Sequence, residues 1–312
     1  MTHPIHPLRL LVAALLAGAS LAATAQDKVL NLYSARHYQT DEALYANFTK
    51  ATGIKINRID TDDAGVTTRL KAEGAASPAD VVLLVDAARL VKAESEGMFQ
   101  PVNSAVLQQR IPAHLRDGSD GGGPQWFGFS TRARIIVYNR SAVQRADVDT
   151  YQELGDPKNK GKVCTRSGSH PYNLTLFGAM LQHLGPQATE AWLKGVVDNM
   201  ARAPKGGDTD QIKAAASGEC AIGLTNSYYL ARLMRSTKPE DVEVVSKIGF
   251  VFPNQDSWGT HVNISGGAMA KQAKNPAEAV KFLEYLASDE AQAYFANGNN
   301  EWPAVATVKV AN

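Results

Sequence analysis

The chain has 312 residues, of which 44% are hydrophobic and 20% charged, with 32 basic and 31 acidic side chains. This balance excludes the strong single-sign field that nucleic-acid and anionic-membrane binders use. The length is too great for one compact core and suits two domains of ordinary size.

The first 25 residues have the features of a secretory signal peptide. A polar start with Arg9 precedes an apolar run over 10–22 and a small-residue cleavage site, Ala23-Thr24-Ala25. The run is too short for a membrane span, and no later segment approaches the roughly 20 apolar residues that cross a bilayer. Cleavage removes one arginine and no acid, so the mature chain from Gln26 should carry no net formal charge. We expect an exported protein without a membrane span.

Two cysteines, Cys164 and Cys220, lie in short apolar runs that resemble strands of one sheet. An oxidising compartment favours a disulfide between them over a metal pair. Two separate buried thiols remain the alternative.

Strand and helix patterns alternate along the first third of the mature chain. The run over 81–85 is fully apolar, as in a strand buried on both faces of a parallel sheet. The βαβαβα order predicts a doubly wound α/β domain whose ligand face lies at the carboxyl ends of the strands. In chain order the expected elements are strand 29–33, helix 41–50, strand 54–59, helix 67–73, strand 81–85 and helix 86–96.

A glycine-rich loop over 117–124 separates this series from a second one. Residues 126–129 and 134–138 are expected to be extended and could cross between the two domains. The elements expected after them are strand 162–165, helices 173–184, 189–200 and 210–216, strand 220–224, a helix that starts at the double tyrosine, strands 242–252 and 261–269, and helices 276–287 and 289–296.

The adjacent tyrosines Tyr228 and Tyr229 follow an apolar strand and precede a helical run. Ser227 is a good N-cap, which would place both phenols at a helix entrance. Seen alone, the pair could also be packing aromatics, one ring buried and one at the surface.

Two other strand-to-helix junctions carry tyrosines, Tyr38 after the first strand and Tyr172 in the second series. Four phenols would make an all-oxygen site. Phenol has a pKa of about 10, so it binds as phenolate only to a strongly charged cation. Hard anionic oxygens favour Fe³⁺ over softer divalent metals.

Four phenolates around Fe³⁺ would leave one net negative charge, which arginine could offset. Arg232, about one turn after Tyr229, is the most specific candidate, although it could also be an ordinary solvated helix arginine. The arginines within or close to these segments are Arg36, Arg132, Arg134 and Arg232.

Three motifs of this chain carry a family resemblance. They are Leu30-Asn31-Leu32-Tyr33-Ser34 with Arg36-His37-Tyr38, Thr131-Arg132-Ala133-Arg134 with Tyr138-Asn139, and Asn226-Ser227-Tyr228-Tyr229. They resemble motifs of the periplasmic ferric-iron-binding proteins, which are substrate-binding components of iron(III) ABC importers. The similarity covers the mature chain and is greatest to the branch with a His-Tyr pair near its start.

The resemblance implies a two-domain periplasmic-binding-protein clamshell of type II, with a doubly wound sheet in each lobe and two crossing hinge strands. Residues 26–127 and 254–312 would form lobe 1, and residues 128–253 would form lobe 2. It further implies a periplasmic monomer that is not an enzyme, binds Fe³⁺ as its cargo and delivers it to an inner-membrane ABC permease.

The resemblance assigns the ligand role to Tyr38, Tyr172, Tyr228 and Tyr229, with His37 as a possible fifth ligand. A synergistic anion such as carbonate could complete the shell. Arg132, Arg134 and Arg232 would lie around the ligands and balance their charge.

Two other functions fit parts of the sequence. A binding protein of the same fold could hold an oxyanion or a small organic solute, and the loop Ser167-Gly168-Ser169 before a helix would suit an anion. The other function is an enzyme, which needs a nucleophile with a base. His170 beside these serines is the only hint of such a pair, and no oriented third group or nucleophile elbow accompanies it.

Overall fold

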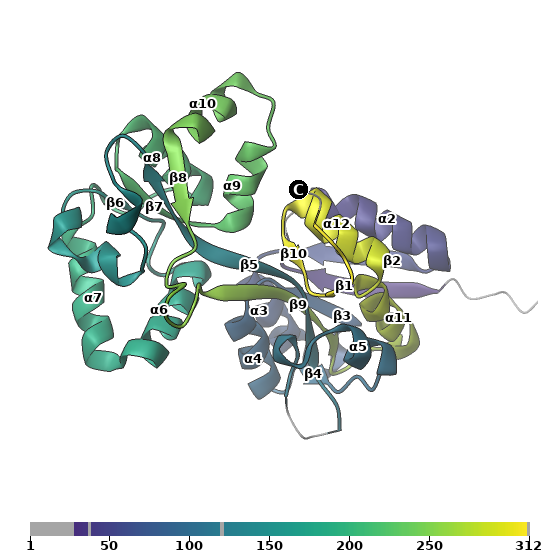
Figure 1. Cartoon of the computed structure of the whole chain (residues 1–312). Helices are drawn as coiled ribbons and strands as arrows, with labels where there is room; N and C mark the ends of the chain where they lie inside the picture. The colour runs from purple at the N-terminus through teal and green to yellow at the C-terminus, as the bar shows by residue number, and fades with distance from the viewer. Residues whose placement is uncertain (1–27, 37–38, 119–121, 311–312) are drawn as a thin grey trace, which may run out of the picture.

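The computed structural model describes residues 28–36, 39–118 and 122–310. Over these ranges the chain forms two lobes, joined at the centre by strands β5 (Trp126–Asn139) and β9 (Val262–Ala270), as Figure 1 shows. The expected α/β clamshell with two crossing strands is confirmed. None of the helices in these ranges is long and apolar enough to cross a membrane.

A continuous path of paired strands runs through both lobes in the order β2-β1-β3-β9-β5-β7-β6. Strand β5 takes part in both lobes, because residues 126–133 pair with β9 and residues 134–138 pair with β7. We call β1–β4, β9, β10 and the first half of β5 the first sheet. Strands β6–β8 and the second half of β5 form the second sheet.

The first sheet and its helices come from both ends of the described chain. In chain order its elements are β1 (Val29–Ser34), α2 (Asp41–Thr52), β2 (Lys55–Asp60), α3 (Asp63–Glu73), β3 (Val81–Leu84), α4 (Ala87–Ser95), β4 (Phe99–Gln100), α5 (Ala105–Arg110), β9, α11 (Pro276–Leu286), α12 (Asp289–Asn299) and β10 (Trp302–Pro303). The intervening elements build the second lobe. They are β6 (Val163–Cys164), α6 (Pro171–Leu184), α7 (Pro186–Asp198), α8 (Asp208–Ser217), β7 (Ile222–Asn226), α9 (Ser227–Met234), α10 (Pro239–Lys247) and β8 (Ile248–Val251).

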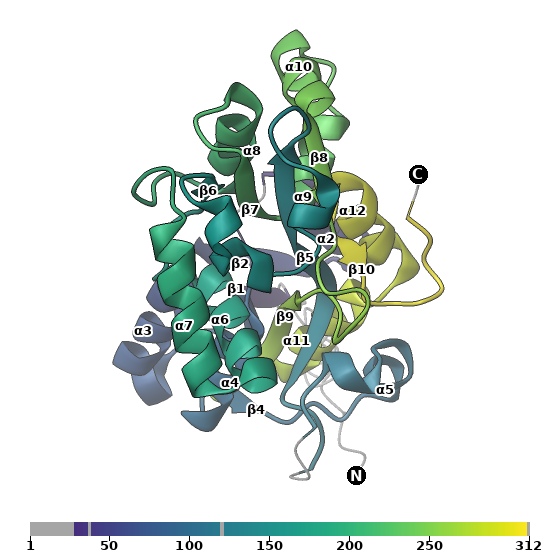
Figure 2. The same cartoon turned by 60° about the vertical axis from the view of Figure 1, so that its left-hand side comes forward.

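Side-chain alternation explains why helices cover both faces of each sheet. Successive strand residues point to opposite faces. In β3, Val81 and Leu83 join a core with α2, α11 and α12, whereas Val82 and Leu84 join a core with α3 and α4. In β5, Ile136 faces α6 and α7, whereas Ile135 and Val137 face α8 and α9. Figure 2 shows α6 and α7 side by side.

The structure corrects one expected element and moves several boundaries. The segment 242–252 was expected to be a strand, but it contains most of α10 followed by β8. Pro239 in the first turn of α10, with Glu240 and Asp241 after it, outweighs the β-branched residues that suggested a strand. The two extended segments near the crossing are one continuous strand, β5, with an irregularity between Gly128 and Ser130.

Candidate functional site

The second lobe brings Tyr172 and the double tyrosine together through two adjacent parallel strands. Strand β6 pairs with β7 in parallel, so both carboxyl ends lie at the same edge of the sheet. The chain leaves β6 through a short loop into α6, whose second residue is Tyr172, and leaves β7 directly into α9. Asn226 is the N-cap of α9 and Ser227 its first residue, so the helix begins one residue earlier than expected. Both tyrosines therefore do lie at a helix entrance.

The phenols meet where the two helices begin. The hydroxyl oxygens of Tyr172 and Tyr228 are 3.2 Å apart, and both side chains are buried. The rings of Tyr228 and Tyr229 are stacked, with centroids 4.3 Å apart and an interplanar angle of 30°. Both tyrosines lie in the first turn of α9. Three of the four expected tyrosines thus form one cluster.

Burial sets the acidity of Tyr172 in this cluster. It raises the pKa of Tyr172 to about 12, and the nearby Tyr229 and Asp208 add to the rise. Arg132 and the hydrogen bond with Tyr228 act in the opposite direction. Tyr172 consequently holds its proton at neutral pH unless a strong positive charge replaces it.

Three arginines lie against the phenol rings. The guanidinium carbon of Arg132 is 5.4 Å from the centre of the Tyr172 ring, and that of Arg166 is 5.1 Å from it. Arg232 stands 5.7 Å from the centre of the Tyr229 ring. Arg132 and Arg232 were expected near the site, whereas Arg166 was not. At these distances the three cations favour negative charge on the phenols.

Arg134 is placed differently from the other expected arginines. It is buried and forms an ion pair with Asp208, and it donates hydrogen bonds to Asn226 (3.1 Å) and Asn173 (2.7 Å). Asp208 also accepts from the backbone N–H of Asn226 (2.7 Å) and from Arg166 (3.2 Å). This buried network joins the starts of α6 and α9 into one frame. Buried charges are stable in such a place because each is paired and hydrogen-bonded.

The buried network was not predicted from the sequence. Asp208 stands at a helix start, where acidic residues are common, and Asn173 lies inside an expected helix. Neither position differs from ordinary surface patterns, so no sequence signal marked them. Asn173 nevertheless fixes the loop before α6 by donating to Thr165 Oγ1 and to the backbone oxygens of Arg166 and Ser167.

His261, at the entrance to β9, faces the same arginines. Burial and the charges of Arg132 and Arg134 lower its pKa to about 4. Within the described ranges its Nε2 atom has no hydrogen-bond partner. The imidazole therefore stays neutral at the crossing of the two lobes at ordinary pH.

A cleft of about 680 Å³ separates the lobes beside the phenols. His170, Pro171 and Tyr172 line it from the second lobe, and the carboxyl ends of β1 and β2 line it from the first. His37 and Tyr38 lie outside the described residues, but their neighbours Arg36 and Gln39 line the cleft. Arg36 itself is buried and pairs with Asp41 and Glu301.

His170 has a structural role at the start of α6. It is the N-cap, and its Nδ1 atom accepts the backbone N–H of Tyr172 at 3.2 Å. Its ring also contacts the Tyr172 ring edge-on, with centroids 4.5 Å apart. The hydroxyls of Ser167 and Ser169 hydrogen-bond to each other at 2.8 Å. These contacts are those of a helix start.

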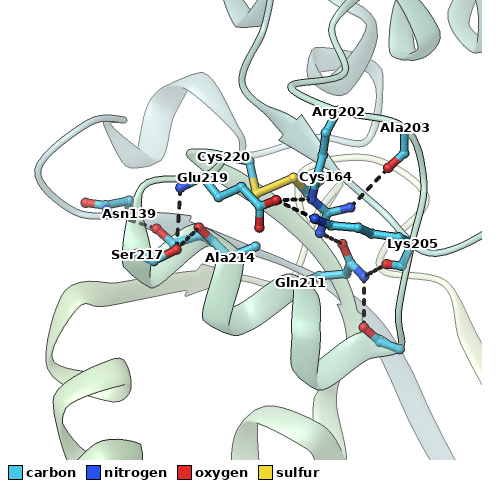
Figure 3. Close-up of a disulfide and its surroundings, with 12 residues drawn as sticks. Asn139, Cys164, Arg202, Ala203, Lys205, Gln211, Ala214, Ser217, Glu219 and Cys220 are labelled. Atoms are coloured by element: carbon cyan, nitrogen blue, oxygen red, sulfur yellow. Dashed lines mark hydrogen bonds and ion pairs between the residues drawn. A yellow bond between two sulfur atoms is a disulfide. The ribbon is translucent and has the colours of Figure 1, made fainter.

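A disulfide joins Cys164 and Cys220, as expected. It connects the end of β6 to the residues just before β7, and Figure 3 shows it beside Glu219, which pairs with Arg202 and Lys205. Each cysteine stands eight residues before a clustered tyrosine, Tyr172 or Tyr228. The crosslink therefore ties together the two strands that carry the phenols.

Known proteins are similar to this chain in sequence and in architecture. Iron uptake protein A1 of Synechocystis is 48% identical over 283 residues, which cover 91% of this chain and 78% of that protein. A Trichodesmium protein solved with iron and citrate ligands has 52% identity and a TM-score of 0.83, covering 91% and 89% of the two chains. The ferric binding protein from Campylobacter jejuni has 40% identity and a TM-score of 0.86, also covering 91% and 89%. The family model of bacterial extracellular solute-binding proteins matches residues 43–311, and the chain belongs to this family.

Proposed function

We propose that this protein is a periplasmic carrier that binds ferric iron in the cleft between its lobes. The ion would be held by the phenolates of Tyr38, Tyr172, Tyr228 and Tyr229, with His37 as the candidate for a fifth ligand. The observation that carries the proposal is the contact of the Tyr172 and Tyr228 hydroxyl oxygens at 3.2 Å, with Tyr229 stacked beside them. Three phenols gathered together, with Tyr172 lining the cleft, are suited to a hard cation.

The high pKa of Tyr172 supports a trivalent ion. A phenol with a pKa of about 12, like that of Tyr172, loses its proton near neutral pH only to a strongly charged ion. Four phenolates and Fe³⁺ leave one net negative charge. Arg132 and Arg232 lie close enough to the phenol rings to offset it, with or without a synergistic anion in the shell.

The family and the names of similar proteins support a transport role. Proteins that resemble this chain are iron uptake and ferric-binding proteins, some of them named as periplasmic. We infer that a monomer of this chain delivers Fe³⁺ to an inner-membrane ABC permease and catalyses no reaction. Residues 26–127 with 254–312 would form the lobe that supplies Tyr38, and residues 128–253 the lobe that supplies the phenol cluster. The change of pairing partner along β5, between residues 133 and 134, supports a division within this strand, six residues beyond the proposed boundary.

A visible-absorbance titration of the apo protein with ferric citrate tests the proposal. Phenolate-to-Fe³⁺ charge transfer should produce a visible band that saturates at one iron per chain. A protein that stays colourless, or that binds an oxyanion or organic solute tightly and iron not at all, would overturn it.

A further inference from the structure

Asn263, in the crossing strand β9, contacts helices of both lobes. Its Oδ1 atom accepts the backbone N–H of Ala87 at 3.0 Å, and its Nδ2 atom donates to Asp86 Oδ2 at 2.8 Å. The same Nδ2 atom donates to Thr175 Oγ1 at 3.0 Å. Asp86 and Ala87 begin α4, whereas Thr175 lies in the first turns of α6.

These two helices belong to different lobes. Helix α4 places Leu90 and Ala93 in the core of the first sheet. Helix α6 places Leu176 and Met180 in the core of the second sheet. The Asn263 amide, which is buried, therefore connects the lobes at a point where their cores do not mix.

The contact on α6 lies one turn beyond Tyr172. The Thr175 hydroxyl donates to the backbone oxygen of Pro171 at 2.9 Å, so it joins Asn263 to the start of the helix. Arg132 makes a parallel connection from β5. It donates to the backbone oxygen of Val85 and to Ser265 Oγ at 3.3 Å while facing the Tyr172 ring. Both connections fix Tyr172 relative to the first lobe.

We propose that Asn263 is a positioning residue that pins α6 to α4 across the hinge and so sets where Tyr172 stands relative to the first lobe. This inference rests on the proposed function, because Tyr172 matters as a ligand of the bound iron. Among the described residues the Asn263 amide hydrogen-bonds to Ala87, Asp86 and Thr175, and it acts on Tyr172 through Thr175. Loss of the pin leaves each lobe folded but widens the range of angles between them. A wider range lowers the fraction of molecules that present all ligands at once, and the apparent affinity falls with that fraction.

A double-mutant cycle on the full-length mature protein tests the pin. Thr175→Val removes the hydroxyl at nearly constant volume, and Thr175→Ser restores it. Asn263→Ala removes the amide, and the double variant completes the cycle. Thr67→Val is the matched control, because the Thr67 hydroxyl bonds only backbone oxygens of its own helix α3 among the described residues. Iron affinity is measured by chelator competition.

The lobe angle is measured on apo protein by the distance distribution between spin labels at Gln109→Cys and Gln187→Cys, one exposed site in each lobe. Thr175→Val should weaken iron binding roughly three- to tenfold, as expected for one hydrogen bond, and broaden the distance distribution. Thr175→Ser should restore both, and Thr175→Val should add nothing once Asn263 is alanine. Thr67→Val should lower the melting temperature about as much as Thr175→Val does, but it should change neither the iron affinity nor the distance distribution.

Unchanged distances and affinity in Thr175→Val, or full additivity in the cycle, would overturn the pin. Failure of the wild-type protein to bind iron would overturn the proposed function instead. The apo distance measurement separates the two cases because it needs no iron.

Discussion

Iron binding to Tyr172 should release the phenol proton. Comparing the pH dependence of iron affinity in the wild type and in Tyr172→Phe should detect this one proton. The pKa of this phenol is about 12 because the side chain is buried. At pH 7 its ionisation costs about 7 kcal/mol, at about 1.4 kcal/mol per pH unit below the pKa. The metal must supply this free energy, so the affinity gained from Tyr172 rises tenfold for each unit of pH.

The magnitude follows from the pH interval chosen. Between pH 5 and pH 8 the contribution of Tyr172 should change about a thousandfold, because both values lie below its pKa. The iron affinity of Tyr172→Phe should therefore fall behind that of the wild type by a ratio that grows about a thousandfold over this interval.

Chelator competition at several pH values gives the ratio directly. The same chelator and iron source serve both proteins, so the pH dependence of free iron and of the chelator cancels. Tyr285→Phe is the control. Burial also raises the pKa of Tyr285 to about 12, but its hydroxyl bonds Leu44 and Glu290 in the first lobe. A ratio for Tyr172→Phe that stays constant with pH would refute a phenolate ligand at this position.

Three further outcomes are expected. Changing both Tyr228 and Tyr229 to Phe keeps the stacked rings, so calorimetry should find the apo melting temperature near that of the wild type. The change removes two phenolate ligands, so visible titration should show iron binding weakened by orders of magnitude. A variant that still turns coloured would contradict the assignment. His261 has a folded pKa of about 4, below the unfolded value of about 6.5, so the unfolded chain binds the extra proton and stability falls as pH drops through this window. Urea unfolding should show that His261→Gln removes up to about 3 kcal/mol of this loss, and equal acid sensitivity in both proteins would argue against a neutral buried imidazole. Reducing the Cys164–Cys220 bond, which spans 56 residues, should lower the free energy of unfolding by about 4 kcal/mol in the chain-entropy model, and denatured unreduced protein with free thiols would disprove the crosslink.

The layered fold was predictable because its strands carry strong local patterns. The apolar run of β3 and the alternation of helix and strand before it needed no tertiary information. The segment over 242–252 was mispredicted because Val242, Val244 and Val245 favour a strand locally. The Glu243–Lys247 ion pair supports the helix that forms, because the two residues are one helical turn apart and Lys247 Nζ lies 2.7 Å from Glu243 Oε1.

The candidate site was predictable to the extent that its chemistry lies in one residue type. Tyrosines at strand-to-helix junctions pointed to a phenol cluster, and Tyr172, Tyr228 and Tyr229 do meet. The frame behind them, Asp208 with Arg134, could not be inferred, because nothing local distinguishes a buried carboxylate from a surface one at a helix start. Its role becomes apparent only when α8, β5 and α9 are brought together.

The order of strands in the first sheet constrains how the chain can fold while its segments become available from the N-terminus to the C-terminus. Strand β9 lies between β3 and β5, yet its residues follow every element of the second sheet along the chain. A chain that ends at Val251 already holds the partners for the second sheet, from β5 to β8. It cannot join β3 to β5, because the strand between them is still to come. The second lobe can thus form as an inserted unit. The first sheet is completed last, when β9 pairs with β3 on one side and with β5 on the other.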